Sequence, residues 1–255
     1  MVDSPSNTNI IETFRRDFQR IKEMGFVRSN RAHNTGVGKT FEDLIGVPEN
    51  NFQLVDYMDF LELKSQRDYT GSMLTLFTKS PDFPQNANTH LRDTYGTQDE
   101  ENPSLKKLHT TASGSRYNSV YDRFGLKLEC DNSVNKIFLR FKNLNNNTVL
   151  PDNIHYNYAT LRHIVEQKCQ NIAYINAETR IVEGHEQFKY NSAVLLTGLS
   201  FDRFINLVNQ GLILYDIRIG SYKSGANFGK IHDHGSGFRV KKADIERVFT
   251  ISNIS

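Results

Sequence analysis

One stretch decides the fold expected for this chain: Leu54-Val55-Asp56-Tyr57-Met58-Asp59-Phe60-Leu61-Glu62-Leu63-Lys64-Ser65-Gln66. Within it, Glu62-Leu63-Lys64 alternates charged and apolar residues, and the two-residue period of a strand puts Glu62 and Lys64 on one face. Acids can hold a divalent cation beside a phosphate, and a lysine can orient water or offset the charge on phosphorus. Such a pair also occurs by chance on exposed strands, so its surroundings decide its meaning.

The position of the upstream acid requires a bend in the chain. A straight strand rises about 3.3 Å per residue, which would leave Asp56 roughly 20 Å and Asp59 roughly 10 Å from Glu62. We therefore expect Asp56 to end one strand or turn, and Glu62 and Lys64 to lie on the next strand, doubling back beside it. Asp59 is the alternative, because a one-residue bulge would exchange the two acids.

A glycine-bounded segment precedes this stretch and supplies another acid. The spacing of Phe41, Leu44 and Ile45 predicts a helix from Gly38 to Gly46. Glu42 on this helix is either solvated or turned towards the cation site. The run 36–40 is not read as a nucleotide-binding loop, because His33 stands where that motif needs glycine and no apolar strand precedes it.

Composition limits the class of protein. With 255 residues and 38% hydrophobic content, the chain can form one large or two small lobes, and two lobes around a cleft are favoured. A net charge of +2 means that any nucleic-acid surface is local. Cys130 and Cys169 are too few for a disulfide framework. No apolar run is long enough for a signal peptide or membrane span, so a cytoplasmic protein with no membrane partner is expected.

The remaining elements are predicted from hydrophobic periodicity. Helices are expected at 9–24, 161–168 and 201–209, and strands at 73–77, 126–129, 136–141, 172–178, 194–197 and 212–219. The strand at 73–77 would bring Lys79 to its end, near the active site. The polar stretch 80–116 reads as long loops, whose possible DNA-backbone contacts are Asn88, Arg92, Arg116 and Tyr117.

The segment 218–242 is basic and rich in glycine. It favours a loop that enters a DNA groove, although a charged surface hairpin has the same composition. Arginine and histidine can donate to guanine, and aspartate can accept from cytosine, which predicts a G·C-rich site. A zinc site at 232–234 is disfavoured, because neighbouring strand residues point to opposite faces. The predicted DNA-binding residues are Lys79, Arg218, Tyr222, Lys230, His232, Asp233, His234 and Arg239.

An ordered series of segments carries a family resemblance. The series comprises 36–46, Glu49-Asn50-Asn51, Asp56, Glu62-Leu63-Lys64, 74–81, 190–193, 216–220, 230–235 and Phe238-Arg239. It resembles the MutH-like restriction endonucleases, most closely the MvaI and BcnI group. The relatives place the first acid five residues before the glutamate, whereas Asp56 stands six before Glu62.

The resemblance implies an α/β fold of the PD-(D/E)xK type, with a mixed central sheet flanked by helices and two lobes around a DNA-binding cleft. It implies Mg²⁺ dependence, a catalytic set of Asp56, Glu62 and Lys64 with Glu42 as the helix acid, and metal ligation by Asp56, Glu62 and the Leu63 carbonyl. Residues 1–130 would form mainly the catalytic lobe and 131–255 mainly the recognition lobe, the two interlocked or sharing a sheet.

The predicted function is a type II restriction endonuclease that hydrolyses double-stranded DNA at a short CC/GG-type site. It would act as a monomer without an obligate protein partner, nicking each strand in turn. Two alternatives stay open: a MutH-type mismatch-repair nickase and a DNA-binding module without catalysis.

Overall fold

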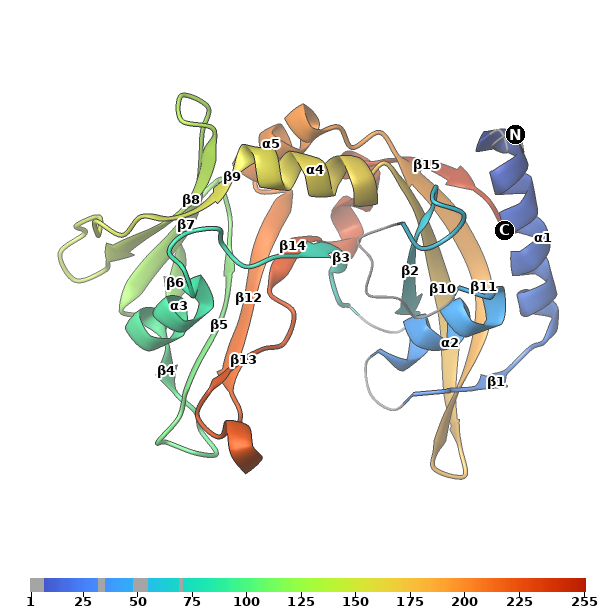
Figure 1. Ribbon diagram of the computed structural model, residues 1–255, viewed down its shortest axis with the longest axis horizontal. Helices are drawn as coiled ribbons and strands as arrows, with labels where there is room; N and C mark the ends of the chain where they lie inside the picture. The colour runs from blue at the N-terminus through green and yellow to red at the C-terminus, as the bar shows by residue number, and fades with distance from the viewer. Residues whose placement is uncertain (1–6, 32–34, 48–54, 69–70) are drawn as a thin grey trace. The chain divides into compact units, whose positions relative to one another are not determined.

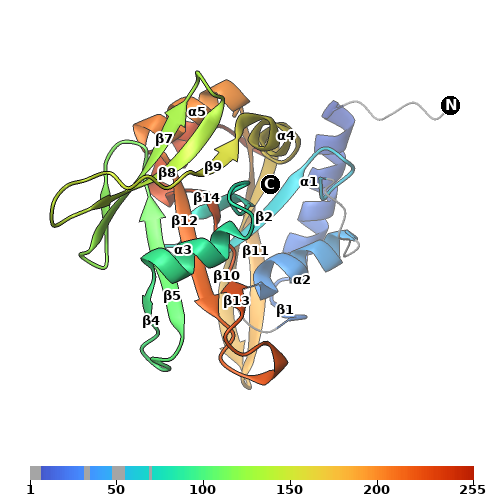
Figure 2. The same cartoon turned by 60° about the vertical axis from the view of Figure 1, so that its left-hand side comes forward.

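The computed structural model describes residues 7–31, 35–47, 55–68 and 71–255, and Figures 1 and 2 show its course. The predicted signals at His33, Glu49-Asn50-Asn51 and Leu54 lie outside these residues. The chain forms two compact units: Met1–Ser72, Gln167–Leu199 and Phe249–Ser255 make the first, and Met73–Glu166 and Ser200–Val248 the second. The structure thus divides the chain differently from the expected boundary at 130, which falls inside a strand of the second unit.

The first unit contains one mixed sheet. Its order is β1 (Val27–Arg28), β11 (His185–Thr197), β10 (Asn171–Val182) and β2 (Glu62–Arg67), with β15 (Thr250–Asn253) also on β11. β2 runs parallel to β10 with Glu62 opposite Ile172, and the other pairs are antiparallel. The strand predicted at Glu62 and Lys64 is therefore present.

Two helices pack on this sheet, as Figures 1 and 2 both show. α1 (Asn7–Glu23) places Phe14 and Phe18 inward, and α2 (Gly36–Ile45) places Phe41 inward. These rings join Tyr190 of β11 in one fully buried aromatic group, with the Phe41 and Tyr190 rings 5.0 Å apart. Because strand and helix residues share this core, the helix that carries Glu42 is held against the sheet that carries Glu62.

The end of α2 confirms the predicted glycine stop. Gly46 adopts a left-handed conformation with φ of 84°, which a residue without Cβ reaches at little cost. The N–H of Val47 then donates to the Glu42 carbonyl at 2.9 Å. The helix begins at Gly36, two residues earlier than expected.

The second unit contains two sheets. The larger has the order β3 (Leu74–Thr78), β14 (Gly237–Val240), β12 (Ile213–Ser221), β5 (Lys106–Ala112) and β4 (Thr97–Gln98), with β13 (Ile231–Asp233) on β12. The smaller has the order β6 (Asn118–Val120), β7 (Phe124–Asp131), β8 (Lys136–Asn143) and β9 (Ile154–Asn157). Its helices are α3 (Ala87–Tyr95), α5 (Phe201–Gln210), α6 (Ile245–Val248) and most of α4 (Tyr158–Lys168), with 3₁₀ turns η1 (Gly225–Asn227) and η2 (Lys242–Asp244).

One expectation for this unit is wrong. The stretch 80–116 does not consist of long loops alone, since it contains α3, β4 and β5. α3 buries only Ala87, Leu91 and Tyr95 from its apolar side, too few for periodicity to stand out among polar residues. β3 is a strand as predicted, and it pairs with β14 in the larger sheet of the second unit.

The paired strands of each described sheet all belong to one unit, so the sharing of a sheet between lobes is not observed. The chain passes from one unit to the other several times. Within the described residues, no helix is long and apolar enough to cross a membrane.

The shared aromatic core predicts a large effect of a single truncation. Phe41→Ala should lower the free energy of unfolding by about 3–5 kcal/mol, through lost apolar burial and the cavity left among the rings. Urea denaturation measures this change. Met24→Ala is the control, because Met24 is 44% exposed and its truncation should change stability by less than about 0.5 kcal/mol. Equal stabilities of the two variants would contradict the core assignment.

Candidate active site

A tight turn brings Asp56 to Glu62. The N–H of Tyr57 donates to the Leu61 carbonyl at 2.9 Å, and Met58 and Asp59 at the tip have φ of 50° and 53°. The chain therefore doubles back, as the spacing of the two acids requires. The side chain of Asp56 accepts the Leu63 N–H at 2.9 Å, whereas Asp59 is exposed at the tip of the turn. Of the two alternatives, the structure places Asp56 at the strand.

Glu62 and Lys64 lie on one face of β2 and touch. The Lys64 ammonium donates to Glu62 Oε1 at 2.5 Å. Only 3% of the Glu62 side chain is exposed, and its Oε2 has no hydrogen-bond partner. A buried carboxylate oxygen without a donor is costly, so this atom is suited to a cation.

The helix acid completes the group. Glu42 and Asp56 are near enough that the negative charge of Asp56, after burial itself, raises the pKa of Glu42. The pKa of Asp56 is also raised, first by burial and then by the negative charge of Glu62. These two effects outweigh the Leu63 N–H and Lys64, which lower it. The predicted residues Glu42, Asp56, Glu62 and Lys64 are thus brought together in the first unit.

The protonation state of Lys64 follows from its neighbours. Burial acts to lower its pKa, but the charge and hydrogen bond of Glu62, helped by Asp56, outweigh burial and raise the pKa above its ordinary value. Lys64 is therefore a cation at neutral pH. It can donate hydrogen bonds and stabilise negative charge, but it is not a proton acceptor.

The donor set fits a hard divalent cation. Crowded carboxylates with raised pKa values and an unpartnered buried oxygen favour Mg²⁺, which binds through one or two carboxylates and keeps several waters. Within residues 7–31, 35–47, 55–68 and 71–255, no group of three or more His, Cys, Asp or Glu side chains has the arrangement of a metal site. Asp56 and Glu62 are the carboxylates of this donor set that lie at the start of β2.

Sequence reasoning missed one cation at this site. Lys168, at the end of α4, has its Nζ 3.5 Å from Glu62 Oε2. Cys169 beside it is fully buried, and burial raises the pKa of its thiol to about 12, so it is not a nucleophile. No local signal marks Lys168, because the pairing of β10 with β2 brings it to Glu62.

In the second unit, the glycine-rich segment is held by an internal carboxylate. Asp233 Oδ1 accepts the N–H groups of Gly235 and Ser236 and the Ser236 hydroxyl, at 2.7–3.0 Å. Its Oδ2 accepts from Asn88 Nδ2 at 2.8 Å. Asp233 is predicted from the sequence to accept from cytosine, but its Oδ1 binds groups of its own turn. Asn88 is a possible contact to the DNA backbone, and here its side chain donates to Asp233.

Buried arginines support the same segment. Arg239 is 7% exposed; its Nη2 donates to the Gly235 carbonyl at 2.7 Å and its Nε lies 3.1 Å from Asp216 Oδ2. Arg92 is 9% exposed and donates to the Ser221 hydroxyl and the Gly229 carbonyl at 2.9 and 3.0 Å. The structure therefore places both in internal contacts rather than on the surface.

The exposed part of the segment is aromatic and basic. The Tyr222 and His232 rings stack at 4.2 Å, and His232 and His234 lie 4.0 Å apart. His234 is an exposed residue overall. Its pKa is nevertheless lowered, first by partial burial of the ring and then by the charges of His232 and His109. Sequence reasoning missed His109, which lies on β5 opposite Arg218 and meets the edge of His234 at 6.3 Å.

The other predicted cations differ in exposure. The Arg218 side chain is 43% exposed and its Nε donates to Asp216 Oδ2 at 2.6 Å. Lys230 is exposed and donates to Asn227. Lys79 belongs to the second unit, where it pairs with Asp82 at 2.9 Å.

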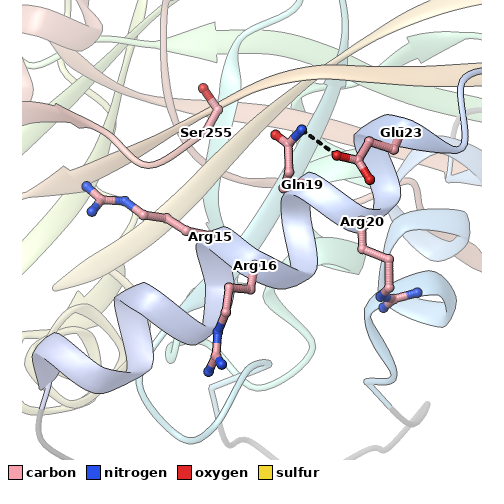
Figure 3. A pocket seen from close by; sticks show the side chains of 6 residues that line it. All are labelled: Arg15, Arg16, Gln19, Arg20, Glu23 and Ser255. Carbon is pink, nitrogen blue, oxygen red and sulfur yellow. Dashed lines mark hydrogen bonds between the residues drawn. The ribbon is translucent and has the colours of Figure 1, made fainter.

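A concave surface lies beside α1, lined by Arg15, Arg16, Gln19, Arg20, Glu23 and Ser255 (Figure 3). Its polar groups make contacts within the unit: Gln19 donates to Glu23 on the same helix and Arg20 donates to the Leu44 carbonyl of α2, both at 2.9 Å. Its lining includes none of the residues of the candidate active site, Glu42, Asp56, Glu62 and Lys64.

Comparison with known families decides the identity. The family described as the MvaI/BcnI restriction endonuclease family matches residues 15–249. The chain belongs to this family. It is therefore a restriction endonuclease, a hydrolase of DNA phosphodiester bonds.

Solved structures of the MvaI/BcnI family agree. The structure titled restriction endonuclease MvaI–cognate DNA substrate complex is 33% identical, with a TM-score of 0.87, covering 99% of this chain and 100% of that one. MvaI in the absence of DNA is 30% identical, with a TM-score of 0.62 and full coverage of both chains. Among curated protein sequences there is no match. The mixed α/β fold with several sheets is thus like that of MvaI.

Substitution of Asp56 and of Asp59 by asparagine tests which of these two acids is needed for cleavage. Asp56→Asn should abolish Mg²⁺-dependent cleavage, and Asp59→Asn should keep it. Folding raises the pKa of Asp56, so ionisation of this group costs stability as pH rises through that pKa. Asp56→Asn should therefore melt no lower than the wild type at neutral pH. Cleavage assays and thermal melts check both points, and loss of cleavage only in Asp59→Asn would reverse the assignment.

The two arginines around Asp216 should respond differently to removal. Arg239→Met should lower stability by about 3 kcal/mol, the low end for a broken buried pair, since Arg218 remains on Asp216. Arg218→Met should cost less than about 1 kcal/mol, because its side chain is partly exposed, and should weaken binding of cognate DNA. Urea denaturation and a DNA-binding titration measure the two effects. Similar stability losses would refute the distinction.

Proposed function

We propose that this family member is a type II enzyme that uses Mg²⁺ to hydrolyse double-stranded DNA at a short G·C-rich site, acting as a monomer. In this proposal the first unit has the PD-(D/E)xK nuclease fold and carries catalysis, and the second unit carries recognition. Both units would contact the same duplex. The single observation that supports the proposal most is the convergence of Glu42, Asp56, Glu62 and Lys64 in the first unit.

The roles follow from the contacts of each side chain. Asp56, Glu62 and the Leu63 carbonyl would hold Mg²⁺, and Glu42 would add negative charge beside Asp56. Bound Mg²⁺ would supply a Lewis acid for the phosphate and lower the pKa of a water. Lys64, kept as an ammonium by Glu62, would orient the attacking water and offset negative charge that develops on phosphorus.

Recognition is proposed for the exposed groups of the second unit. Arg218, His232 and His234 can donate to guanine N7 and O6 in a major groove, which favours a CC/GG-type site. Tyr222 supports the His232 ring by stacking, and Lys230 can contact phosphate. Asp233 and Arg239 are proposed to shape the loop instead of reading bases, because their contacts are internal.

Two rivals make different predictions about activity. A MutH-type nickase would need partner proteins, and a module without catalysis would bind DNA and leave it uncut in Mg²⁺. The described chain places one Glu62–Lys64 pair in its first unit, so each binding event would cut one strand. Both strands of a nearly symmetric site would then be cut by rebinding in the opposite orientation.

Purified protein with Mg²⁺ should convert a single-site supercoiled plasmid first to the open circle and then to the linear form. Lys64→Ala and Glu62→Ala should each lower the rate by at least about a hundredfold while keeping specific binding, since both act on water and metal. Gel analysis of time courses measures the rates, and sequencing of the ends identifies the site. Lys22→Ala on α1 is the matched control and should cleave like the wild type.

Cleavage retained in both Lys64→Ala and Glu62→Ala would refute the catalytic assignment. Direct conversion to linear DNA, together with a dimer in sedimentation, would refute the monomeric mechanism. Binding without any cleavage would favour the inactive module, and activity only with added repair proteins would favour the nickase.

A further inference from the structure

The two oxygens of Glu62 meet two different ammonium groups. Lys64 donates to Oε1 at 2.5 Å, in a close hydrogen-bonded pair. Lys168 Nζ lies 3.5 Å from Oε2, and this oxygen accepts no hydrogen bond. The Lys168 contact is therefore electrostatic, and Oε2 keeps its lone pairs available.

The fold, and not the local sequence, puts Lys168 there. β10 runs parallel to β2 with Ile172 opposite Glu62. Lys168 ends α4 four residues before Ile172, so the chain entering β10 passes the start of β2. A lysine in the last turn of a helix is also favoured by the helix dipole, which keeps the side chain near this end.

The acids at this site outnumber its two ammonium groups. Glu42, Asp56 and Glu62 are three acids, whereas Lys64 and Lys168 are two cations. Lys39 also acts on Glu42, but its ammonium is paired with Asp43 at 2.8 Å. Lys168 is 27% exposed at its side chain, so its ammonium can reach water when another cation takes Oε2.

We propose that Lys168 is a positioning residue, an internal counter-ion of Glu62 that balances the acidic site before a divalent cation binds and moves aside when it does. This inference rests on the proposed metal site. Lys168 would keep the acids of the metal-free protein together, and it would raise the Mg²⁺ concentration that the site needs. Lys64 cannot take this role, because its hydrogen bond holds it on the other oxygen.

Calorimetric titration of metal-free protein with Mg²⁺, in the absence of DNA, tests the proposal. Lys168→Met and Lys168→Gln should bind Mg²⁺ about tenfold more tightly than the wild type, because the competing cation is gone. Lys168→Arg keeps the charge and should bind like the wild type. Lys22→Met removes the same charge from α1 and should also bind like the wild type.

Thermal melts separate this role from simple support of the fold. In EDTA, Lys168→Met and Lys168→Gln should melt below the wild type, because Glu62 has lost one of its two counter-ions. Saturating Mg²⁺ should remove that difference, since the cation replaces the missing charge. A lysine that only supports packing would lower the melting temperature equally in both conditions.

Equal or weaker Mg²⁺ affinity in both neutral variants would overturn the proposal, as would a melting difference that Mg²⁺ does not change. Failure of the wild type and both neutral variants to bind Mg²⁺ would overturn it as well. Plasmid cleavage by the wild type decides the proposed function separately. Unchanged Mg²⁺ affinity with weakened DNA binding would show instead that Lys168 contacts phosphate.

Discussion

The parallel pairing of β2 with β10 is the constraint on which the first unit depends. It places Glu62, the first residue of the strand at the end of the sheet order, opposite Ile172 and brings the end of α4 to the same strand end. The aromatic core between the sheet and α2 then holds Glu42 on the adjoining side. Three separate segments, α2, β2 and the end of α4, thus contribute charged side chains to one place.

Bringing these acidic side chains together costs free energy until their negative charge is neutralised. Burial and mutual repulsion raise the pKa values of Glu42 and Asp56, which means that the folded state disfavours their ionised forms. The fold bears that cost because Lys64, Lys168 and the Leu63 N–H offset part of it. A site with remaining negative charge and one buried oxygen without a hydrogen-bond donor is suited to a cation.

In the second unit, some polar side chains hold the glycine-rich turn in place, and others are exposed. Asp233 and Arg239 use their polar atoms on the turn that carries His234, and the Asp216 carboxylate anchors Arg218 and Arg239. Gly220 leaves room for the His234 ring, because a Cβ there would lie 3.2 Å from its Nε2. These contacts hold the turn that carries His234, and the Asp216 carboxylate holds the guanidinium of Arg218 on β12.

The sequence by itself determined several of the local elements and the catalytic candidates. Alternation at Glu62-Leu63-Lys64, the glycine stop after α2, and the spacing from Asp56 to Glu62 each reflect local backbone geometry, which neighbouring residues control. The ordered series of segments also identified the family, which the match over residues 15–249 confirms. Only the tertiary structure decided the division of the chain into units, the sheet that β3 joins and the burial of Arg92 and Arg239. It also brought Lys168 to Glu62 and His109 to His234, because such contacts depend on strand pairing between distant segments, and residue type and spacing do not encode which strands pair.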